Sequence, residues 1–148
     1  MYTIFEIAKN FQEREHGIFI EKIQRLCWYA YSWYIFSNNS PDQKNLDTLF
    51  NGQAQAGVDG PIFKELYEDV QFNNSEKLNK AKDITNIKVI EYLDQIWKVY
   101  GKLTGSQLDK LTKQEKPWIN ARNRLQTNST NLRDIDNYNI FEEPSYES

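Results

Sequence analysis

Few side chains in this 148-residue chain could carry catalysis, and the first to consider is its single histidine. His16 stands in the polar stretch "EREHG", where no cysteine or carboxylate cluster follows at the spacing of zinc ligands or of a catalytic triad. Cys27 is the single cysteine, so the chain can form neither an internal disulfide nor a multi-cysteine metal site. We therefore expect a surface histidine, no metal centre and a reducing compartment.

Carboxylates and glycines offer no better arrangement for catalysis. Glu68 and Asp69 are adjacent in sequence, as are Glu142 and Glu143, and adjacent side chains on a helix point apart instead of sharing a substrate. No glycine-rich loop follows an apolar strand, so neither a phosphate cradle nor a dinucleotide turn is expected. The sequence predicts a protein that is not an enzyme and needs no cofactor.

Aromatic side chains make up 14% of the residues and fall into three clusters. Most should belong to the core, because Trp and Tyr bury large areas. The first cluster has more rings than one buried helix face can hold, and rings left at the surface commonly anchor protein interfaces. The clusters are Trp28, Tyr29, Tyr31, Trp33 and Tyr34; Trp97 and Tyr100; and Trp118. The sequence therefore favours binding of a protein partner over catalysis.

Composition defines the class of protein and excludes two kinds of partner. A length of 148 residues suits one domain with its own core. The formal net charge of -3 argues against a nucleic-acid partner, because phosphate binding needs clustered Lys and Arg. The N-terminal stretch has neither a basic leader nor a long apolar run, so we expect no signal peptide, no membrane association and a cytoplasmic location.

Apolar residues at helical spacing predict the elements that must position these side chains. Helices are expected over residues 3–14, 20–37 and 86–100, with the second as the core and Gly101 as the C-cap of the third. Pro61 should be the first residue of a helix that extends to residue 70, after a Gly60 with a backbone angle that other residues avoid.

The remaining stretches predict loops and shorter helices. Residues 46–58 should form an irregular loop with room for a short strand, and the polar residues 71–83 a mobile connector. Ser106 should cap a short helix, and Pro117 should begin another. A last helix is expected over residues 128–143, with Leu132, Ile135, Tyr138 and Phe141 turned inward.

These elements predict the overall class. We expect a mainly α fold, a compact single-domain bundle of roughly six helices over residues 1–141. Residues 142–148 should follow it as a short acidic C-terminal tail. The oligomeric state does not follow from the pattern.

Three stretches resemble the Panacea domain, a SocA-like antitoxin family also found in phage-associated proteins. They are "KIQRLCWYAYSWY" (22–34), "GPIFKELY" (60–67) and "LTKQEKPWINAR" (111–122), and together with their flanks they extend the resemblance over residues 2–141. Two departures are visible. Gln55, Ala56 and Gly57 stand where the family has Glu-Ala-Trp, and Lys113 follows Thr112 where the family has a histidine.

The resemblance implies a helical module that neutralises a neighbouring protein toxin, by direct binding or by delivering it to a protease, in the bacterial cytoplasm. It implies a protein partner and no catalysis. The residues expected to bind the partner are Trp28, Tyr31, Gly60, Pro61, Tyr67, Glu115 and Arg122. Glu115 and Arg122 are close enough in sequence to fix Trp118 by charge-assisted contacts. The structural alternative, which we favour for Trp118, is that these side chains only lock the last helices onto the second one. The alternative is a phage-encoded inhibitor of a host defence nuclease, for which the acidic balance is the support.

Overall fold

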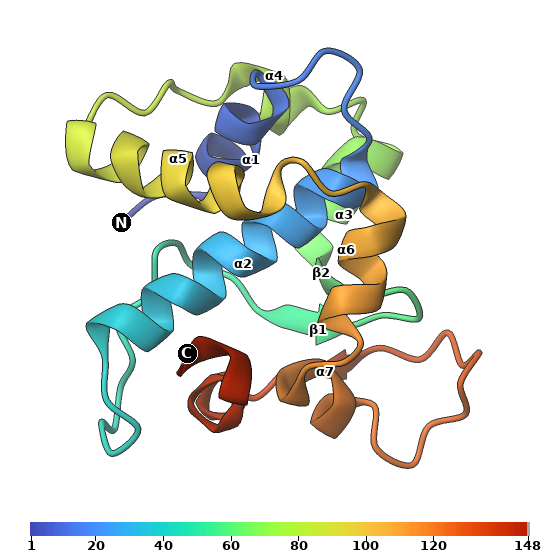
Figure 1. The fold of residues 1–148 in the computed structure, drawn as a ribbon. Coiled ribbons are helices and arrows are strands. Elements are labelled where there is room, and N and C mark those ends of the chain that lie inside the picture. Colours follow the sequence, from blue (N-terminus) through green and yellow to red (C-terminus); the bar gives the residue numbers. More distant parts are fainter. Residues whose placement is uncertain (148) are drawn as a thin grey trace.

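A computed structural model, which describes residues 1–147, shows a mainly α-helical chain with a small antiparallel sheet (Figure 1). The expected mainly α class, with a short strand between residues 46 and 58, is confirmed, but residues 1–147 contain seven α-helices and two 3-10 helices where roughly six helices were expected. The α-helices are α1 (Ile4–Gln12), α2 (Ile20–Asn38), α3 (Lys64–Phe72), α4 (Glu76–Lys80), α5 (Ile87–Tyr100), α6 (Gly105–Thr112) and α7 (Lys116–Ala121). The 3-10 helices are η1 (Asn137–Glu142) and η2 (Pro144–Tyr146). The strands are β1 (Ala54–Ala56), β2 (Pro61–Phe63) and β3 (Arg133–Asp134), in the order β2-β1-β3.

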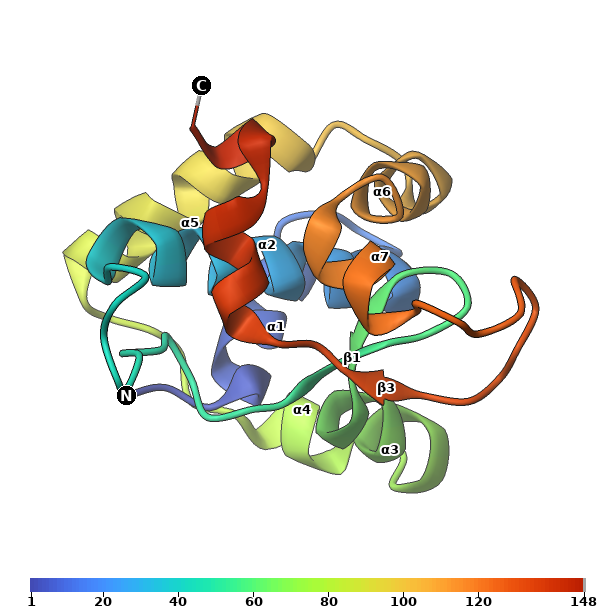
Figure 2. The ribbon, with the colours of Figure 1, turned by 90° about the horizontal axis from the view of Figure 1, so that it is seen from below.

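Helix α2 lies at the centre of the fold (Figures 1 and 2). It contacts α1, α5, α6, β2 and η1, and every side chain from Lys22 to Ser32 is buried. The all-round burial confirms the prediction that this helix is the core. The polar side chains within this stretch must find partners inside the protein, because burial without a hydrogen bond is costly.

The predicted helix start at Pro61 is wrong, because Pro61 begins strand β2 and α3 starts only at Lys64. The Gly57 N–H donates to Gly60 O at 3.0 Å, and the next pair along the hairpin is Ala56 with Pro61. In an antiparallel ladder, hydrogen-bonded pairs alternate with pairs that are not hydrogen-bonded. The main-chain N–H and C=O groups of the second kind, here Ala56 and Pro61, point away from the partner strand. The missing N–H of Pro61 therefore costs the hairpin no hydrogen bond.

Side chains of α2 bind the outer edge of β2. The Gln24 amide donates to Phe63 O at 3.1 Å and accepts from the Phe63 N–H at 2.8 Å. Arg25 Nη1 donates to Pro61 O at 3.0 Å. A strand of three residues is thus held on one edge by β1 and on the other by a helix.

The predicted mobile connector over residues 71–83 is instead ordered around Asp69. Its carboxylate accepts hydrogen bonds from the Lys77 and Leu78 N–H groups at the start of α4. These bonds and one from Asn73 hold the pKa of Asp69 below its usual value against the opposing effect of burial. Leu78 is buried, so the segment packs on the core.

Three predictions about where helices begin or end can be checked against the structure. Gly101 is the C-cap of α5, as predicted. Thr104, not Ser106, caps α6, because its side chain accepts from the Gln107 N–H while Gln107 bonds back to the Thr104 N–H. Pro117 lies in the first turn of α7, as predicted, and Ala121 ends that helix.

The predicted helix over residues 128–143 is wrong. Residues 133–135 pair with β1 instead, and the Ile135 N–H donates to Ala54 O at 2.9 Å. Ile135 is buried as expected, but Leu132 is 40% exposed. The helical part of this range is η1, and the Asp136 side chain caps it by accepting from the Tyr138 N–H.

The segment expected as an acidic tail packs on α2 over its described part, which ends at residue 147. Glu143 and Tyr146 are buried. The Tyr146 ring meets Trp33 edge-on with ring centroids 4.5 Å apart, and its hydroxyl shares a hydrogen bond with Ser32. Residue 148 of the predicted tail lies outside the described residues.

Candidate protein-binding groove

A buried arginine supports the tip of the β1–β2 hairpin. Arg25 Nε donates to Asp109 Oδ1 at 2.9 Å, which links α2 to α6. Gly60 lies directly against this guanidinium, with φ at +153°, and a Cβ there would stand 2.5 Å from Arg25 Nε. The expectation that Gly60 adopts a backbone angle unsuited to other residues is confirmed.

Trp118 ties α7 to the same hairpin. Its Nε1 donates to Gly57 O at 2.8 Å, and the Arg122 guanidinium lies 5.6 Å from the centre of its ring. The indole that follows Pro117 therefore has a structural task, because it fixes the first residue of the hairpin turn.

Arg122 organises the loop between α7 and β3. Its guanidinium donates to the carbonyls of Ala56, Gln126, Thr127, Ser129 and Asn131. Figure 2 shows this loop extending from α7 before the chain returns to β3. Arg122 is buried beneath the loop, so it shapes the surface without forming it.

We expect Arg122→Lys to lower the free energy of unfolding by about 2 kcal/mol and to make the loop more sensitive to protease. A lysine has three donors and cannot satisfy five carbonyls, and hydrogen bonds from charged groups contribute about 1.5 to 3 kcal/mol each. Denaturant unfolding and limited proteolysis would measure both effects. Arg124→Lys, at an exposed site in the same loop, is the control, and equal behaviour of the two variants would contradict this role.

A groove of about 540 Å³ opens beside these supports. We call it the hairpin groove; the start of α2, the hairpin tip, α3 and residues 130–132 line it. Three large apolar side chains on it are exposed to solvent: Tyr67 at 47%, Phe72 at 75% and Leu132 at 40%. Exposed apolar side chains gathered around one concavity are typical of a protein-interaction surface.

Charged residues surround the apolar part of the hairpin groove. Glu21, Asp59 and Glu68 are exposed lining residues, against one exposed lining cation, Lys64. Within residues 1–147 none of these three carboxylates takes part in an ion pair. The lining therefore combines exposed apolar side chains with three acidic ones, and we call Glu21, Asp59 and Glu68 the acidic rim of the groove.

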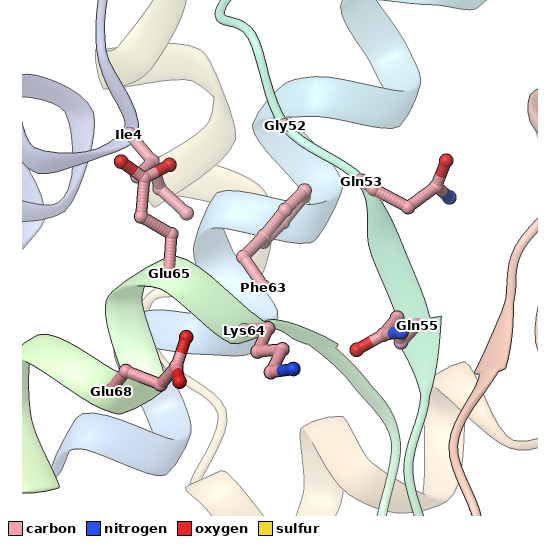
Figure 3. A pocket seen from close by; sticks show the side chains of 8 residues that line it. All are labelled: Ile4, Gly52, Gln53, Gln55, Phe63, Lys64, Glu65 and Glu68. Atoms are coloured by element: carbon pink, nitrogen blue, oxygen red, sulfur yellow. The ribbon is translucent and has the colours of Figure 1, made fainter.

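A smaller cavity of about 300 Å³ lies between the start of α1, β1 and α3 (Figure 3). The Gln53 amide points away from it and donates to the carbonyls of Ala54 and Ile135. Glu65 and Glu68 come from successive turns of α3 and do not meet at one point (Figure 3). This cavity has neither the exposed aromatic side chains of the hairpin groove nor a set of converging polar groups.

Glu115 lies in the core, away from the groove. It is buried, and its Oε2 accepts a hydrogen bond from the Tyr29 hydroxyl at 3.0 Å. Burial raises the pKa of Glu115 to about 8, although the Tyr29 hydrogen bond opposes the shift. The other carboxylate oxygen has no hydrogen-bond partner within residues 1–147. Of the two charged residues near Trp118 in sequence, Arg122 contacts its ring, whereas Glu115 forms no ion pair in this part of the chain.

The structure separates the seven residues predicted to lie near a partner. Tyr67 is exposed on the hairpin groove, and Gly60 forms part of its lining. Gly60 itself is buried, and so are the other five: Trp28, Tyr31, Pro61, Glu115 and Arg122. Trp28 and Tyr31 are at most 2% exposed, so their rings pack the core and do not face a partner in this structure.

Two exposed residues of the hairpin groove, Phe72 and Leu132, are not among the residues predicted to bind a partner. Phe72 falls in the stretch taken for a polar connector, and Leu132 was expected to face inward. The apolar character of both residues is visible in the sequence, but the exposure of Leu132 depends on the pairing of the next residues with β1.

Within residues 1–147 no helix combines the length and hydropathy that a membrane crossing requires. Nor does this part of the chain bring together three or more His, Cys, Asp or Glu side chains that could hold a metal ion. Comparison of the chain with protein-family models, curated proteins and solved structures gives no match.

Proposed function

We propose that this chain is a non-catalytic module that binds another protein through the hairpin groove. The observation that carries the proposal is the exposure of Tyr67, Phe72 and Leu132 around one concavity. Large side chains of this kind supply most of the binding energy at protein interfaces, and a rigid support lowers the entropic cost of binding. Arg25, Trp118 and Arg122 provide that support from below.

The partner we propose is a protein toxin encoded beside this chain in a bacterial genome, neutralised in the cytoplasm by direct binding or by delivery to a protease. The sequence resemblance to Panacea antitoxins supports this role. Tyr67 is the residue at which that resemblance and the exposed groove coincide.

Growth rescue tests the proposal. The neighbouring gene expressed alone should arrest growth, and co-expression of this chain should restore it. Phe72→Asp should abolish rescue, because it places a charge at the centre of the apolar contact, and it should leave the fold intact since Phe72 is 75% exposed. Ile87→Asp is the matched control: Ile87 is 70% exposed but does not line the groove.

Two outcomes would contradict the proposal. If growth stays arrested with the wild-type chain, the neighbouring product is not its target. If Phe72→Asp rescues as well as Ile87→Asp does, the hairpin groove is not the binding surface.

The acidic rim of the groove favours a second candidate, an inhibitor of a host defence nuclease. Glu21, Asp59 and Glu68 could oppose the basic surface that such an enzyme offers to nucleic acid. Purified chain would then block cleavage by the nuclease, and Phe72→Asp would relieve the block.

A further inference from the structure

The charges of the hairpin groove point to the chemistry of its occupant, an inference that rests on the proposed function. We infer that the groove receives a segment of the partner protein in which apolar side chains alternate with Lys or Arg. The apolar side chains would cover Tyr67, Phe72 and Leu132, and the cations would meet the acidic rim.

The carboxylates of the rim are free to bind a cation. Glu21, Asp59 and Glu68 are exposed, and none takes part in an ion pair within residues 1–147. The nearest buried cation is already committed, because Arg25 bonds to Asp109 and to Pro61 O. Opposite charges across an interface speed the encounter and fix its register.

The same charges disfavour other classes of ligand. A phosphate backbone or an acidic peptide would face three carboxylates against two cations, Lys64 and Arg25, and Arg25 is buried and bonded to Asp109. A purely apolar segment would leave the rim carboxylates partly desolvated without partners, which costs free energy. An apolar and basic segment satisfies both parts of the groove.

The supports of the groove indicate that it exists before the partner arrives. Trp118 and Arg25 fix the two ends of the hairpin turn through Gly57 O and Pro61 O. Arg122 bonds to Ser129 O and Asn131 O on either side of Thr130, at the wall formed by Thr130 and Leu132. A preformed groove binds a short peptide without a large ordering cost, so isolated peptides can serve as probes.

The test uses random peptides displayed on phage, selected on the full chain and counter-selected on Phe72→Asp. Selected sequences, made as fluorescent peptides, are then measured by anisotropy. We expect apolar residues together with Lys or Arg in the selected peptides.

Neutralising the rim with Glu21→Gln, Asp59→Asn and Glu68→Gln together should weaken peptide binding about tenfold, as expected for three exposed charge pairs. The control neutralises Glu13, Asp47 and Glu91, exposed carboxylates outside the groove, and should leave the affinity unchanged.

The outcomes separate this inference from the function on which it rests. Suppose that the selected peptides bind the wild type, lose affinity for Phe72→Asp and keep their affinity for the variant with the neutralised rim. The groove would then remain the binding site, but the inference that its occupant is basic would be wrong. Acidic peptides from the selection would overturn it in the same way. A selection that yields no peptide sensitive to Phe72→Asp would overturn both the occupant and the groove.

Discussion

Replacing Gly60 by alanine should lower the free energy of unfolding by about 3 to 5 kcal/mol, from backbone strain and from displacement of a partly buried ion pair. The new Cβ would lie 2.5 Å from Arg25 Nε and 3.0 Å from Thr112 Oγ1. Arg25 cannot move away freely, because Asp109 and Pro61 O both hold its guanidinium. Either the hairpin tip must shift or the ion pair must break.

Gly17 provides a control for the strain alone. Its φ is +72°, but a Cβ there would meet nothing within 4 Å. Gly17→Ala should therefore cost about 1 kcal/mol, the value for a non-glycine residue in the left-handed region. Urea unfolding would compare the two variants, and a loss at Gly60 no larger than the loss at Gly17 would contradict the expected cost of the contact with Arg25.

Replacing Glu115 by glutamine should change how stability depends on pH. Burial raises the pKa of Glu115 from 4.5 to about 8, so between these values the folded chain holds a proton that the unfolded chain has lost. Stability therefore falls as pH rises through this window, by at most about 1.4 kcal/mol per pH unit from this group. Glutamine keeps an acceptor for the Tyr29 hydroxyl and cannot take a charge.

The measurement is the free energy of unfolding of the wild type and of Glu115→Gln at several pH values from 5 to 8.5. The wild type should lose stability toward alkaline pH relative to the variant. Glu91→Gln is the control, because Glu91 is exposed and its replacement should leave the pH dependence unchanged. Parallel curves for wild type and Glu115→Gln would mean that this carboxyl ionises as easily in the folded chain as in the unfolded one.

Long periodic helices could be predicted from the sequence, whereas short elements held by distant side chains could not. Helices α2 and α5 carry apolar spacing over several turns, and the structure confirms both. Strand β2 has three residues, and its outer edge depends on Gln24 and Arg25, which lie far away in the chain. Gly60 and Pro61 favour a helix start locally, and the hairpin contacts override that preference.

The candidate site was predictable only in part for a related reason. Tyr67 was found through the resemblance, and Gly60 through its expected backbone angle. The exposure of Leu132 follows from the pairing of residues 133–135 with β1, a contact between segments about 80 residues apart in the chain. The burial of Glu115 likewise depends on Tyr29, far from it in sequence. A single sequence shows residue types but not which distant segments cover them.

The way α2 occupies the outer edge of β2 limits how a partner can bind. With Gln24 and Arg25 on the Phe63 and Pro61 main-chain groups, a foreign strand finds no free donors and acceptors there to extend the sheet. The opposite edge belongs to β3, only two residues long and charged at Arg133 and Asp134, which discourages edge-to-edge aggregation. The partner that we propose would therefore recognise this protein by its side chains and not by strand addition, and substitutions on the surface could change its specificity while the sheet stays intact.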